Sequence, residues 1–386
     1  LVPFSELDAL AAEVGDAPYP ACDTAADDVV LIAFTSGTTG RPKGTVHFHR
    51  DVLAICDTFS ARVLRPRPDD VFIGSPPIAF TFGLGGLVTF PLRAGATAAL
   101  LERAGPDVLV DAIEEYGATV LFTAPTAYRR MLALGMEGRA PSLRRCVSAG
   151  EALPLPVFEA WREATGIALI DGIGATEMLH VFISAADDDI RPGATGRPVP
   201  GYEARIVDDE MRELPPGEVG RLAVRGPTGC RYLDDPRQRD YVRDGWNLTG
   251  DAFVMDADGW FHYRARTDDM IVSGGYNISG PEVEEALFEH PDVLECAVYG
   301  VPSELTEEEV MAAVVRRPGA SLSATAFWQY CKEKLPRFMI PRYVRFVSAL
   351  PKTPTDKVEK FRLAKEGPTP DTFDREREAA NEGRGA

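Results

Sequence analysis

The residues best suited to chemistry form a short run rich in glycine and hydroxyl side chains, Thr35-Ser-Gly-Thr-Thr-Gly-Arg-Pro-Lys-Gly44. Glycines let backbone amides approach a ligand closely, while hydroxyl groups donate hydrogen bonds and a lysine adds positive charge. This combination predicts a cradle for the phosphates of a nucleoside triphosphate. The spacing G-x-x-x-x-G-K-[ST] is absent, so the run is not a Walker A loop. Its hydroxyl and cationic members are Thr35, Ser36, Thr38, Thr39 and Lys43, and its glycines are Gly37, Gly40 and Gly44.

The segments around this run alternate between strand and helix patterns. An apolar strand over Val29–Phe34 leads directly into it, and Asp107–Gly117 has the spacing of a helix. Ala118–Thr123 is a β-branched buried strand, and a helical stretch, Thr126–Leu134, and a short strand, Arg145–Ser148, follow. This alternation predicts an α/β protein with parallel-rich sheets covered by helices.

The sequence pattern changes after residue 195. Short strands separated by Pro, Gly and Asp turns over 196–264 predict a small β-rich subdomain. After Thr267 the alternation resumes, and Ser279-Gly-Pro-Glu282 predicts a helix start by its capping-box form. We therefore expect a large domain over 1–267 and a small mobile α+β domain over 268–365. The charged, Pro-rich residues 366–386 predict a disordered tail.

Composition limits the function classes. The 386 residues carry a formal net charge of -18, which argues against a nucleic-acid binder. The six cysteines form no CxxC pair, which favours reduced thiols in a cytoplasmic enzyme. No apolar run is long enough to span a bilayer. The pair His47 and His49 lacks a third ligand, so we reject a metal site there.

The run Thr35–Gly44 resembles the signature of the AMP-forming adenylate synthetases, which include acyl-CoA synthetases, peptide-synthetase adenylation domains and firefly luciferase. Each further match is weak alone, because a Thr-Gly-Asp triplet is commonly a turn and a lysine is commonly solvated. Their shared order along the chain makes the resemblance specific. The matching segments are Ser148–Pro154, Asp171–Glu177, Thr249–Asp251, Ala265–Asp269 and Pro351–Lys357.

The resemblance implies roles for individual residues. ATP and Mg²⁺ would be cofactors and coenzyme A a co-substrate, with Thr176 contacting phosphate and Glu177 helping to hold Mg²⁺. Asp251 would clamp the ribose, Asp268 would be the hinge, and Lys357 would be the adenylation lysine. Further ATP-binding residues would be Gly150, Glu151, Asp171, Gly172 and Arg266, and the coenzyme A face would comprise Ser273, Gly274 and Gly275.

The acid pocket is predicted from Ile78–Gly86 and from the segment after Gly172. Phe80 and Phe82 offer flat apolar walls for an aromatic acid. The sequence looks closest to benzoate–CoA and 2-aminobenzoate–CoA ligases, which implies a pocket that also contains Thr81, Gly174, His180 and Val181. An aspartate that would anchor an α-amino group is absent from this stretch, which favours an aryl or acyl acid. The alternative is that these aromatic residues and His180 are ordinary core.

The chain departs from the family pattern at three places. Leu1–Asp28 stand where the family has a whole amino-terminal subdomain, so we expect that subdomain to be largely missing. Asp356 replaces the glycine before Lys357, and Ala265 replaces the hinge glycine. The predicted function is aryl-CoA ligation, with two alternatives: an enzyme that loads a carrier-protein thiol, and a truncated inactive relative that only binds nucleotide. A homodimer is an open alternative for the assembly.

Overall fold

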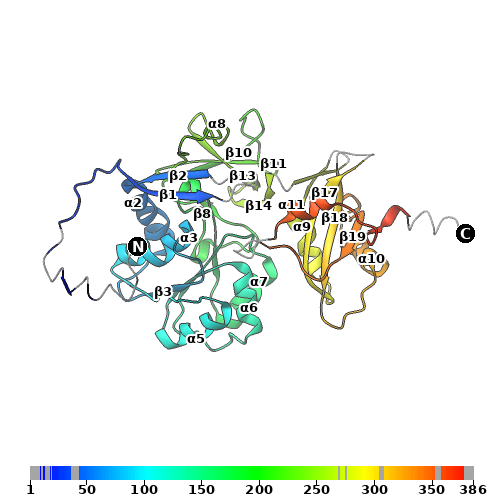
Figure 1. Cartoon of the computed structure of the whole chain (residues 1–386), viewed down its shortest axis with the longest axis horizontal. Helices are drawn as coiled ribbons and strands as arrows, with labels where there is room; N and C mark the ends of the chain where they lie inside the picture. The colour runs from blue at the N-terminus through cyan, green and yellow to red at the C-terminus, as the bar shows by residue number, and fades with distance from the viewer. Residues whose placement is uncertain are drawn as a thin grey trace, which may run out of the picture.

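The structure is a computed structural model in which the chain forms two lobes (Figure 1). The larger lobe contains a seven-stranded sheet, a five-stranded sheet and a hairpin, and the smaller lobe is built around a four-stranded sheet. No helix in the described part of the chain has the length and apolar character needed to cross a bilayer. The described residues are 9, 12–13, 18, 20–35, 43–267, 270–273, 276–303, 308–352 and 358–377.

The seven-stranded sheet confirms the predicted parallel-rich α/β organisation. Five neighbouring strands run parallel, and the last two are antiparallel. Because parallel strands need crossover connections, helices separate them in the sequence. In spatial order the strands are β4 (Thr97–Ala98), β3 (Val71–Gly74), β5 (Val120–Thr123), β6 (Arg145–Ala149), β7 (Leu169–Gly174), β8 (Val181–Ser184) and β9 (Arg197–Pro198).

Helices pack on both faces of this sheet. One face carries α5 (Pro106–Tyr116), α6 (Pro125–Ala133) and α7 (Leu155–Thr165), which lie together at the lower side of Figure 1. Their apolar residues, including Leu109 and Trp161, form a continuous buried cluster with the strands. A second cluster, around Phe59, Phe90 and Phe122, covers the other face. The helical segments on this second face are α2 (His49–Ile55), η2 (Cys56–Leu64), α3 (Thr81–Leu84), η3 (Gly85–Thr89) and α4 (Phe90–Ala94).

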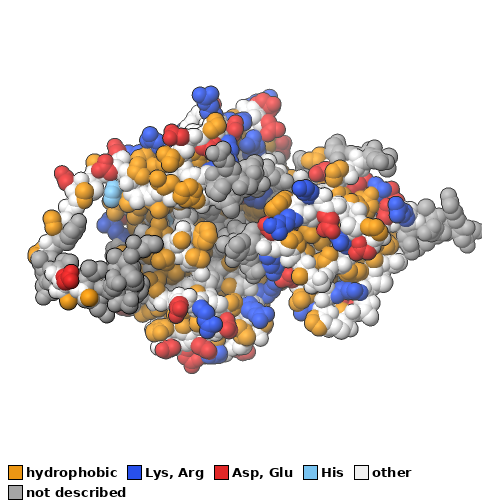
Figure 2. Space-filling view, in the orientation of Figure 1, with side chains coloured by type: hydrophobic (Ala, Val, Ile, Leu, Met, Phe, Trp, Pro, Cys, Tyr) orange, Lys and Arg blue, Asp and Glu red, His pale blue; other side chains and the backbone are white. Residues whose placement is uncertain are grey.

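The predicted strand before the phosphate run is β1 (Val29–Thr35), and it pairs antiparallel with β2 (Lys43–Phe48). The backbone N–H of Val46 donates to the Arg231 carbonyl at 2.7 Å, and that of Leu233 donates to the Gly44 carbonyl at 2.8 Å. The hairpin is therefore attached to the β-rich subdomain. Apolar side chains gather on the surface over this hairpin (Figure 2), where Phe34 is 67% exposed.

The five-stranded sheet confirms the predicted β-rich subdomain and adds a long strand that we did not predict. Strand β13 (Trp246–Met255) runs through Thr249-Gly-Asp251, so this triplet is not a turn. Both faces of β13 are buried, which removes the alternation that would have revealed it. The sheet contains β10 (Glu203–Val207), β11 (Val219–Arg225), β13, β12 (Val242–Arg243) and β14 (Phe261–Arg266), with α8 (Gln238–Tyr241) before β12.

The smaller lobe begins with the hairpin of β15 (Met270–Ser273) and β16 (Tyr276–Ser279). The Ser279 hydroxyl accepts from the Glu282 backbone N–H at 3.2 Å, which confirms the predicted start of helix α9. The remaining elements are α9 (Gly280–Phe288), β17 (Val293–Pro302), β18 (Glu308–Arg316), α10 (Ala324–Lys334), β19 (Tyr343–Phe346), α11 (Lys360–Glu366) and β20 (Phe373–Asp374).

Residues 366–377 do not form the disordered tail that composition predicted. Phe373 and Asp374 make strand β20, which pairs antiparallel with β19. Ion pairs explain this order: Arg342 contacts Glu309 at 3.0 Å and Asp374 at 3.4 Å. Residues 378–386 lie outside the described part of the chain.

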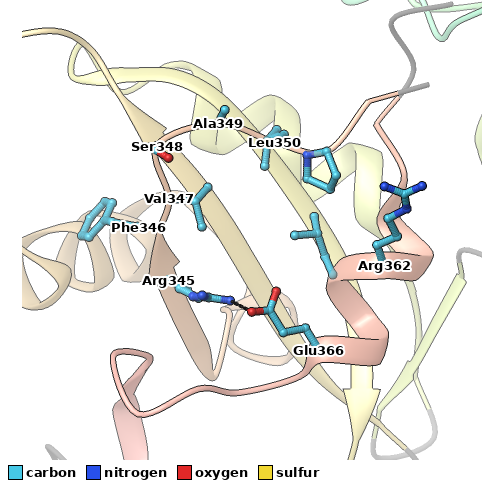
Figure 3. A pocket seen from close by; sticks show the side chains of 10 residues that line it. Arg345, Phe346, Val347, Ser348, Ala349, Leu350, Arg362 and Glu366 are labelled. Atoms are coloured by element: carbon cyan, nitrogen blue, oxygen red, sulfur yellow. Dashed lines mark ion pairs between the residues drawn. The ribbon is translucent and has the colours of Figure 1, made fainter. Parts of the chain in front are cut away.

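An open cavity of about 650 Å³ lies beside this region, between the end of β19 and α11 (Figure 3). Leu350 and Leu363 line it, and Arg345 pairs with Glu366 at 3.0 Å across one end. None of its lining residues belongs to the predicted ATP, acid or coenzyme A sites.

The Arg342 ion pairs give a test of this packing. Arg342→Met should lower the free energy of unfolding by about 3 kcal/mol, because it removes the positive charge shared by Glu309 and Asp374, whose side chains are only 9% and 10% exposed. Urea unfolding of the full chain measures this loss. Arg362→Met is the matched control, since Arg362 is mostly exposed, and it should change the midpoint little. Equal midpoints for the two variants would contradict this account.

Candidate active site

Polar groups gather where the parallel strands end. Thr123 closes β5, Ser148 lies near the end of β6, and Asp171 lies in β7. The Thr123 hydroxyl is within 2.5 Å of the Ser75 hydroxyl, which follows β3. Because ligands of open α/β sheets bind at the carboxyl ends of the strands, this edge is the expected place for a binding site.

A lysine, a tyrosine and a glutamate meet at this edge. The Lys43 Nζ of β2 lies 3.6 Å from Glu177 Oε1, and Glu177 belongs to η4 (Thr176–Met178), directly after β7. Between them, the Tyr232 hydroxyl accepts from Lys43 Nζ at 2.7 Å and donates to Glu177 Oε1 at 2.5 Å. We call Lys43, Tyr232 and Glu177 the charged cluster. It joins two segments that the sequence analysis assigned to one phosphate site.

Thr176 is held by a histidine of the hairpin. The Nε2 atom of His47 donates to the Thr176 carbonyl at 2.7 Å, and the His47 side chain is fully buried. The second ring nitrogen of His47 lies 3.7 Å from Asp51 Oδ2, one helical turn away. His47 therefore ties the short η4 turn to β2 and fixes the backbone from which Thr176 and Glu177 project.

Asp251 and Arg266 stand opposite each other on β13 and β14. Arg266 Nη1 donates to Asp251 Oδ1 at 3.0 Å and to the Thr249 carbonyl at 3.1 Å. Burial raises the pKa of Asp251, Arg266 opposes this shift, and the negative charge of Glu177 adds to it. The influence of Glu177 means that the predicted ribose carboxylate and the charged cluster share one region.

Gly250 permits the Arg266 contact. Its φ is +76°, a backbone conformation that favours glycine, and a Cβ there would lie 2.8 Å from Arg266 Nη2.

Asp171 is held in a different electrostatic state. Burial raises the pKa of Asp171 to about 7, and a hydrogen bond from the Gly172 backbone opposes that shift. Gly172 itself packs against β8, since a Cβ there would lie 2.8 Å from Val181 Cγ1. Asp171 and Gly172 therefore lie where β7 and β8 pack closely together.

An aromatic cluster lies beside the strand ends and surrounds His180. The His180 ring centroid is 4.6 Å from that of Phe90, 5.3 Å from that of Phe59 and 5.8 Å from that of Phe82. Burial lowers the pKa of His180 to about 3, so the imidazole is neutral at physiological pH. Gly85 faces this ring, and a Cβ at that position would overlap it.

Four of the six predicted acid-pocket residues come together: Phe82, Gly174 and Val181 lie next to His180. Gly174 pairs with Val181 in the β7–β8 register, and a Cβ on Gly174 would lie 2.7 Å from the His180 carbonyl oxygen. Phe82 packs against His180 and Phe122. Phe80, in contrast, is 47% exposed and Thr81 only begins helix α3.

Comparison with known proteins assigns the chain to a family. The model of the AMP-binding enzyme family matches residues 2–231, and the model of its C-terminal domain matches residues 282–357. The chain belongs to the AMP-binding enzyme family. It is an acid–thiol ligase by class, since the matched relatives include CoA ligases.

The relatives cover most of this chain. Benzoate–CoA ligase of Thauera aromatica is 36% identical over 92% of this chain and 70% of its own length. The 3-hydroxybenzoate–CoA ligase of Aromatoleum sp. (strain CIB) is 37% identical over 88% of this chain and 66% of its own length. Among solved structures, the anthranilate CoA ligase AuaEII in complex with anthranoyl-AMP is 37% identical with a TM-score of 0.84, over 90% of this chain and 69% of that protein.

Two further residues of the predicted ATP set lie in the loop after β6. Gly150 has a φ of +90°. The Glu151 carboxylate accepts from the Thr126 backbone N–H at 3.3 Å and from its hydroxyl at 3.2 Å, so it caps helix α6. Their contact with ATP stays a prediction.

Several members of the family motifs lie outside the described residues. Ser273, which precedes the predicted coenzyme A glycines, ends β15 opposite Tyr276. Thr35 is described and ends β1. The residues outside the described part are Ser36, Gly37, Thr38, Thr39, Gly40, Asp268, Gly274, Gly275 and Lys357.

Sequence reasoning missed Tyr232 and the role of His47. Tyr232 lies between strands β11 and β12, in a stretch with no motif of its own. The only signal for His47 was its place on a strand that follows the phosphate run, which does not reveal an inward side chain.

The burial of His180 predicts a pH effect on stability. Its pKa is about 3 in the folded protein and about 6.5 when exposed, so the unfolded chain binds a proton that the folded chain excludes. Stability from this group is therefore present above pH 6.5 and is lost as the pH falls toward 3. Between pH 7 and 5.5 the loss should be on the order of 1 kcal/mol.

The measurement is urea unfolding of the wild type and of His180→Gln at both pH values. Asp171 titrates in the opposite sense over part of this range, so the difference between the two proteins isolates His180. The wild type should lose on the order of 1 kcal/mol more than the variant. Parallel losses would show that His180 is not held neutral.

Proposed function

We propose that this chain activates an aromatic carboxylic acid of the benzoate or 2-aminobenzoate type with ATP and then transfers the acyl group to coenzyme A. AMP and pyrophosphate would be released. The observation that carries the proposal is the meeting of Lys43, Glu177 and Asp251 in one region, beside the aromatic cluster around His180.

The charge arrangement suits the first half-reaction. The substrate carboxylate attacks the α-phosphate of ATP, and both partners are anions. The barrier falls when fixed positive charge and hydrogen-bond donors face the phosphates. Lys43 and the hydroxyl groups from Thr35 to Thr39 would provide them, and Thr176 would contact a phosphate oxygen. Asp251 would accept hydrogen bonds from the ribose hydroxyls.

Glu177 fits a divalent cation that is bound together with the nucleotide. Among the described residues, no group of three or more His, Cys, Asp or Glu side chains forms a metal site by itself. Mg²⁺ is commonly held by one or two carboxylates and substrate phosphates, and Glu177 offers such a carboxylate next to Lys43. When bound, Mg²⁺ would supply further positive charge to the phosphates.

The aromatic cluster suits an uncharged ring. Phe82, Gly174 and Val181 would form apolar walls, and the neutral His180 would add a polar edge without a net charge. Phe80 and Thr81 would border the entrance. The names of the relatives support this class of acid, since they include a benzoate–CoA ligase and an anthranilate CoA ligase.

The second half-reaction would use the smaller lobe. We propose that Lys357 acts in adenylation and that the lobe then turns about Asp268, so that Ser273, Gly274 and Gly275 face the pantetheine chain. Small residues let a narrow chain pass close to the backbone.

The direct test is ATP–pyrophosphate exchange by the full chain with benzoate, 2-aminobenzoate and acetate. Exchange should depend on an aromatic acid, and Asp251→Asn should lower it at least tenfold, because the amide offers the ribose hydroxyls only one acceptor oxygen and no negative charge. Lys357→Ala should abolish exchange while MgATP binding remains. Asp258→Asn, which changes an exposed carboxylate, is the matched control.

Three other outcomes distinguish the alternatives. Exchange with acetate alone would contradict the aromatic acid. Thioester formation on a pantetheinylated carrier protein but not on coenzyme A would favour the carrier-loading enzyme. MgATP binding without exchange for any acid would favour the inactive relative.

Gly85 tests the acid pocket separately from the phosphate site. Gly85→Ala places a methyl group in the space of the His180 ring, so the ring or the helix must shift. The KM for the aromatic acid should rise about tenfold, equivalent to about 1.4 kcal/mol. The KM for MgATP should stay within about twofold of the wild type, because this substitution leaves the charged cluster unchanged. Equal changes in both constants would contradict a separate acid pocket around His180.

A further inference from the structure

Tyr232 has two hydrogen-bond partners in the charged cluster, and they carry opposite charges. Its hydroxyl donates to Glu177 Oε1 at 2.5 Å and accepts from Lys43 Nζ at 2.7 Å. The Lys43 ammonium also lies 4.6 Å from the centroid of the Tyr232 ring, within cation–π distance. A phenol hydroxyl has one hydrogen, so these two partners fix the direction of the O–H bond. It points toward the carboxylate and away from the ammonium.

The backbone and the neighbours of Tyr232 hold it in this position. Tyr232 is 6% exposed and forms a bridge with Thr45 of β2. Its backbone N–H donates to the Gln238 side-chain oxygen at 2.6 Å, and the Gln238 amide donates in turn to the Cys230 carbonyl at 3.0 Å. The Tyr241 ring packs edge-on against it with centroids 5.8 Å apart. The hydroxyl is therefore a rigid spacer.

The spacing matters because Lys43 and Glu177 attract each other. Their charged atoms lie 3.6 Å apart, already within ion-pair distance, and the phenol hydroxyl bridges them at 2.7 and 2.5 Å, so part of the interaction of each goes to the phenol. Without the hydroxyl, this ion pair would shorten into a direct hydrogen-bonded contact. An ion pair in this half-buried place would have to be broken before either group could reach another charge.

We infer that Tyr232 is a positioning residue that keeps Lys43 and Glu177 apart and oriented, so that both remain available to the phosphates of ATP and their divalent cation. This inference rests on the proposed function of the charged cluster as a phosphate site. It goes beyond that function because Tyr232 belongs to none of the motifs used to predict the site.

The test is MgATP binding to the full chain by calorimetry, without acid or coenzyme A. Tyr232→Phe should weaken MgATP binding about tenfold, since a hydrogen bond to a charged group is lost and the Lys43–Glu177 ion pair shortens. Adding Tyr232→Phe to Glu177→Gln should weaken binding no further, because Tyr232 acts through that carboxylate. Tyr330→Phe, which removes a tyrosine hydroxyl bonded to the Ala286 carbonyl in the smaller lobe, is the matched control.

A kinetic readout separates positioning from folding. In pyrophosphate exchange, Tyr232→Phe should raise the KM for MgATP about tenfold and leave the KM for the acid within about twofold. If Tyr232→Phe lowers only the fraction of protein that binds MgATP and leaves the Kd unchanged, the role of Tyr232 is purely structural and the inference is overturned. Additive effects of Tyr232→Phe and Glu177→Gln would also overturn it.

Failure of this inference and failure of the proposed function give different results. If the wild type binds MgATP but shows no acid-dependent exchange, the proposed function fails while the binding comparison still decides the role of Tyr232. If the wild type binds no MgATP, the inference is overturned as well.

Discussion

The structure depends on one interaction, the contact of an ammonium, a phenol and a carboxylate that come from three separate segments. Lys43 belongs to the β1–β2 hairpin, Glu177 follows strand β7, and Tyr232 lies in the β-rich subdomain. Charged groups leave water at a high cost unless they are paired and hydrogen-bonded. The two backbone hydrogen bonds between the hairpin and residues 231–233, together with the bond from His47 to Thr176, bring the three segments into register for this pairing. The seven-stranded and five-stranded sheets are thereby joined at the predicted phosphate site.

An apolar environment lies beside this charged cluster. His180 is surrounded by phenylalanine rings and carries no charge at physiological pH. Because Gly85 and Gly174 have no side chain, the backbone at both positions lies close to His180. A charged region therefore adjoins an apolar region, and in the proposed function the first receives the phosphates, the second receives the ring, and the carboxylate of the acid lies at the boundary between them. This division explains why substitutions around His180 and around Lys43 are expected to change different kinetic constants.

Much of the fold could be predicted from local patterns, because its helices and parallel strands have a strong periodicity. The helix at Pro106–Tyr116, the strand at Val120–Thr123 and the Ser279 cap are examples. Strand β13 escaped prediction because both of its faces are buried, and β20 because it has only two residues, held by an ion pair of Arg342 and by the packing of Phe373. In the site, Lys43, Glu177 and Asp251 could be identified through motifs. Tyr232 and His47 could not, because their roles arise from contacts between segments that are distant in the sequence.

The central claim is that the charged cluster receives the phosphates of ATP. A crystal structure of the full chain with Mg²⁺ and a non-hydrolysable ATP analogue tests it most directly. The account predicts phosphate oxygens within hydrogen-bond distance of Lys43, the ribose hydroxyls at Asp251, and the Tyr232 hydroxyl still bound to Glu177. A nucleotide bound elsewhere, with Lys43, Tyr232 and Glu177 in their present contacts and touching no phosphate, would contradict it.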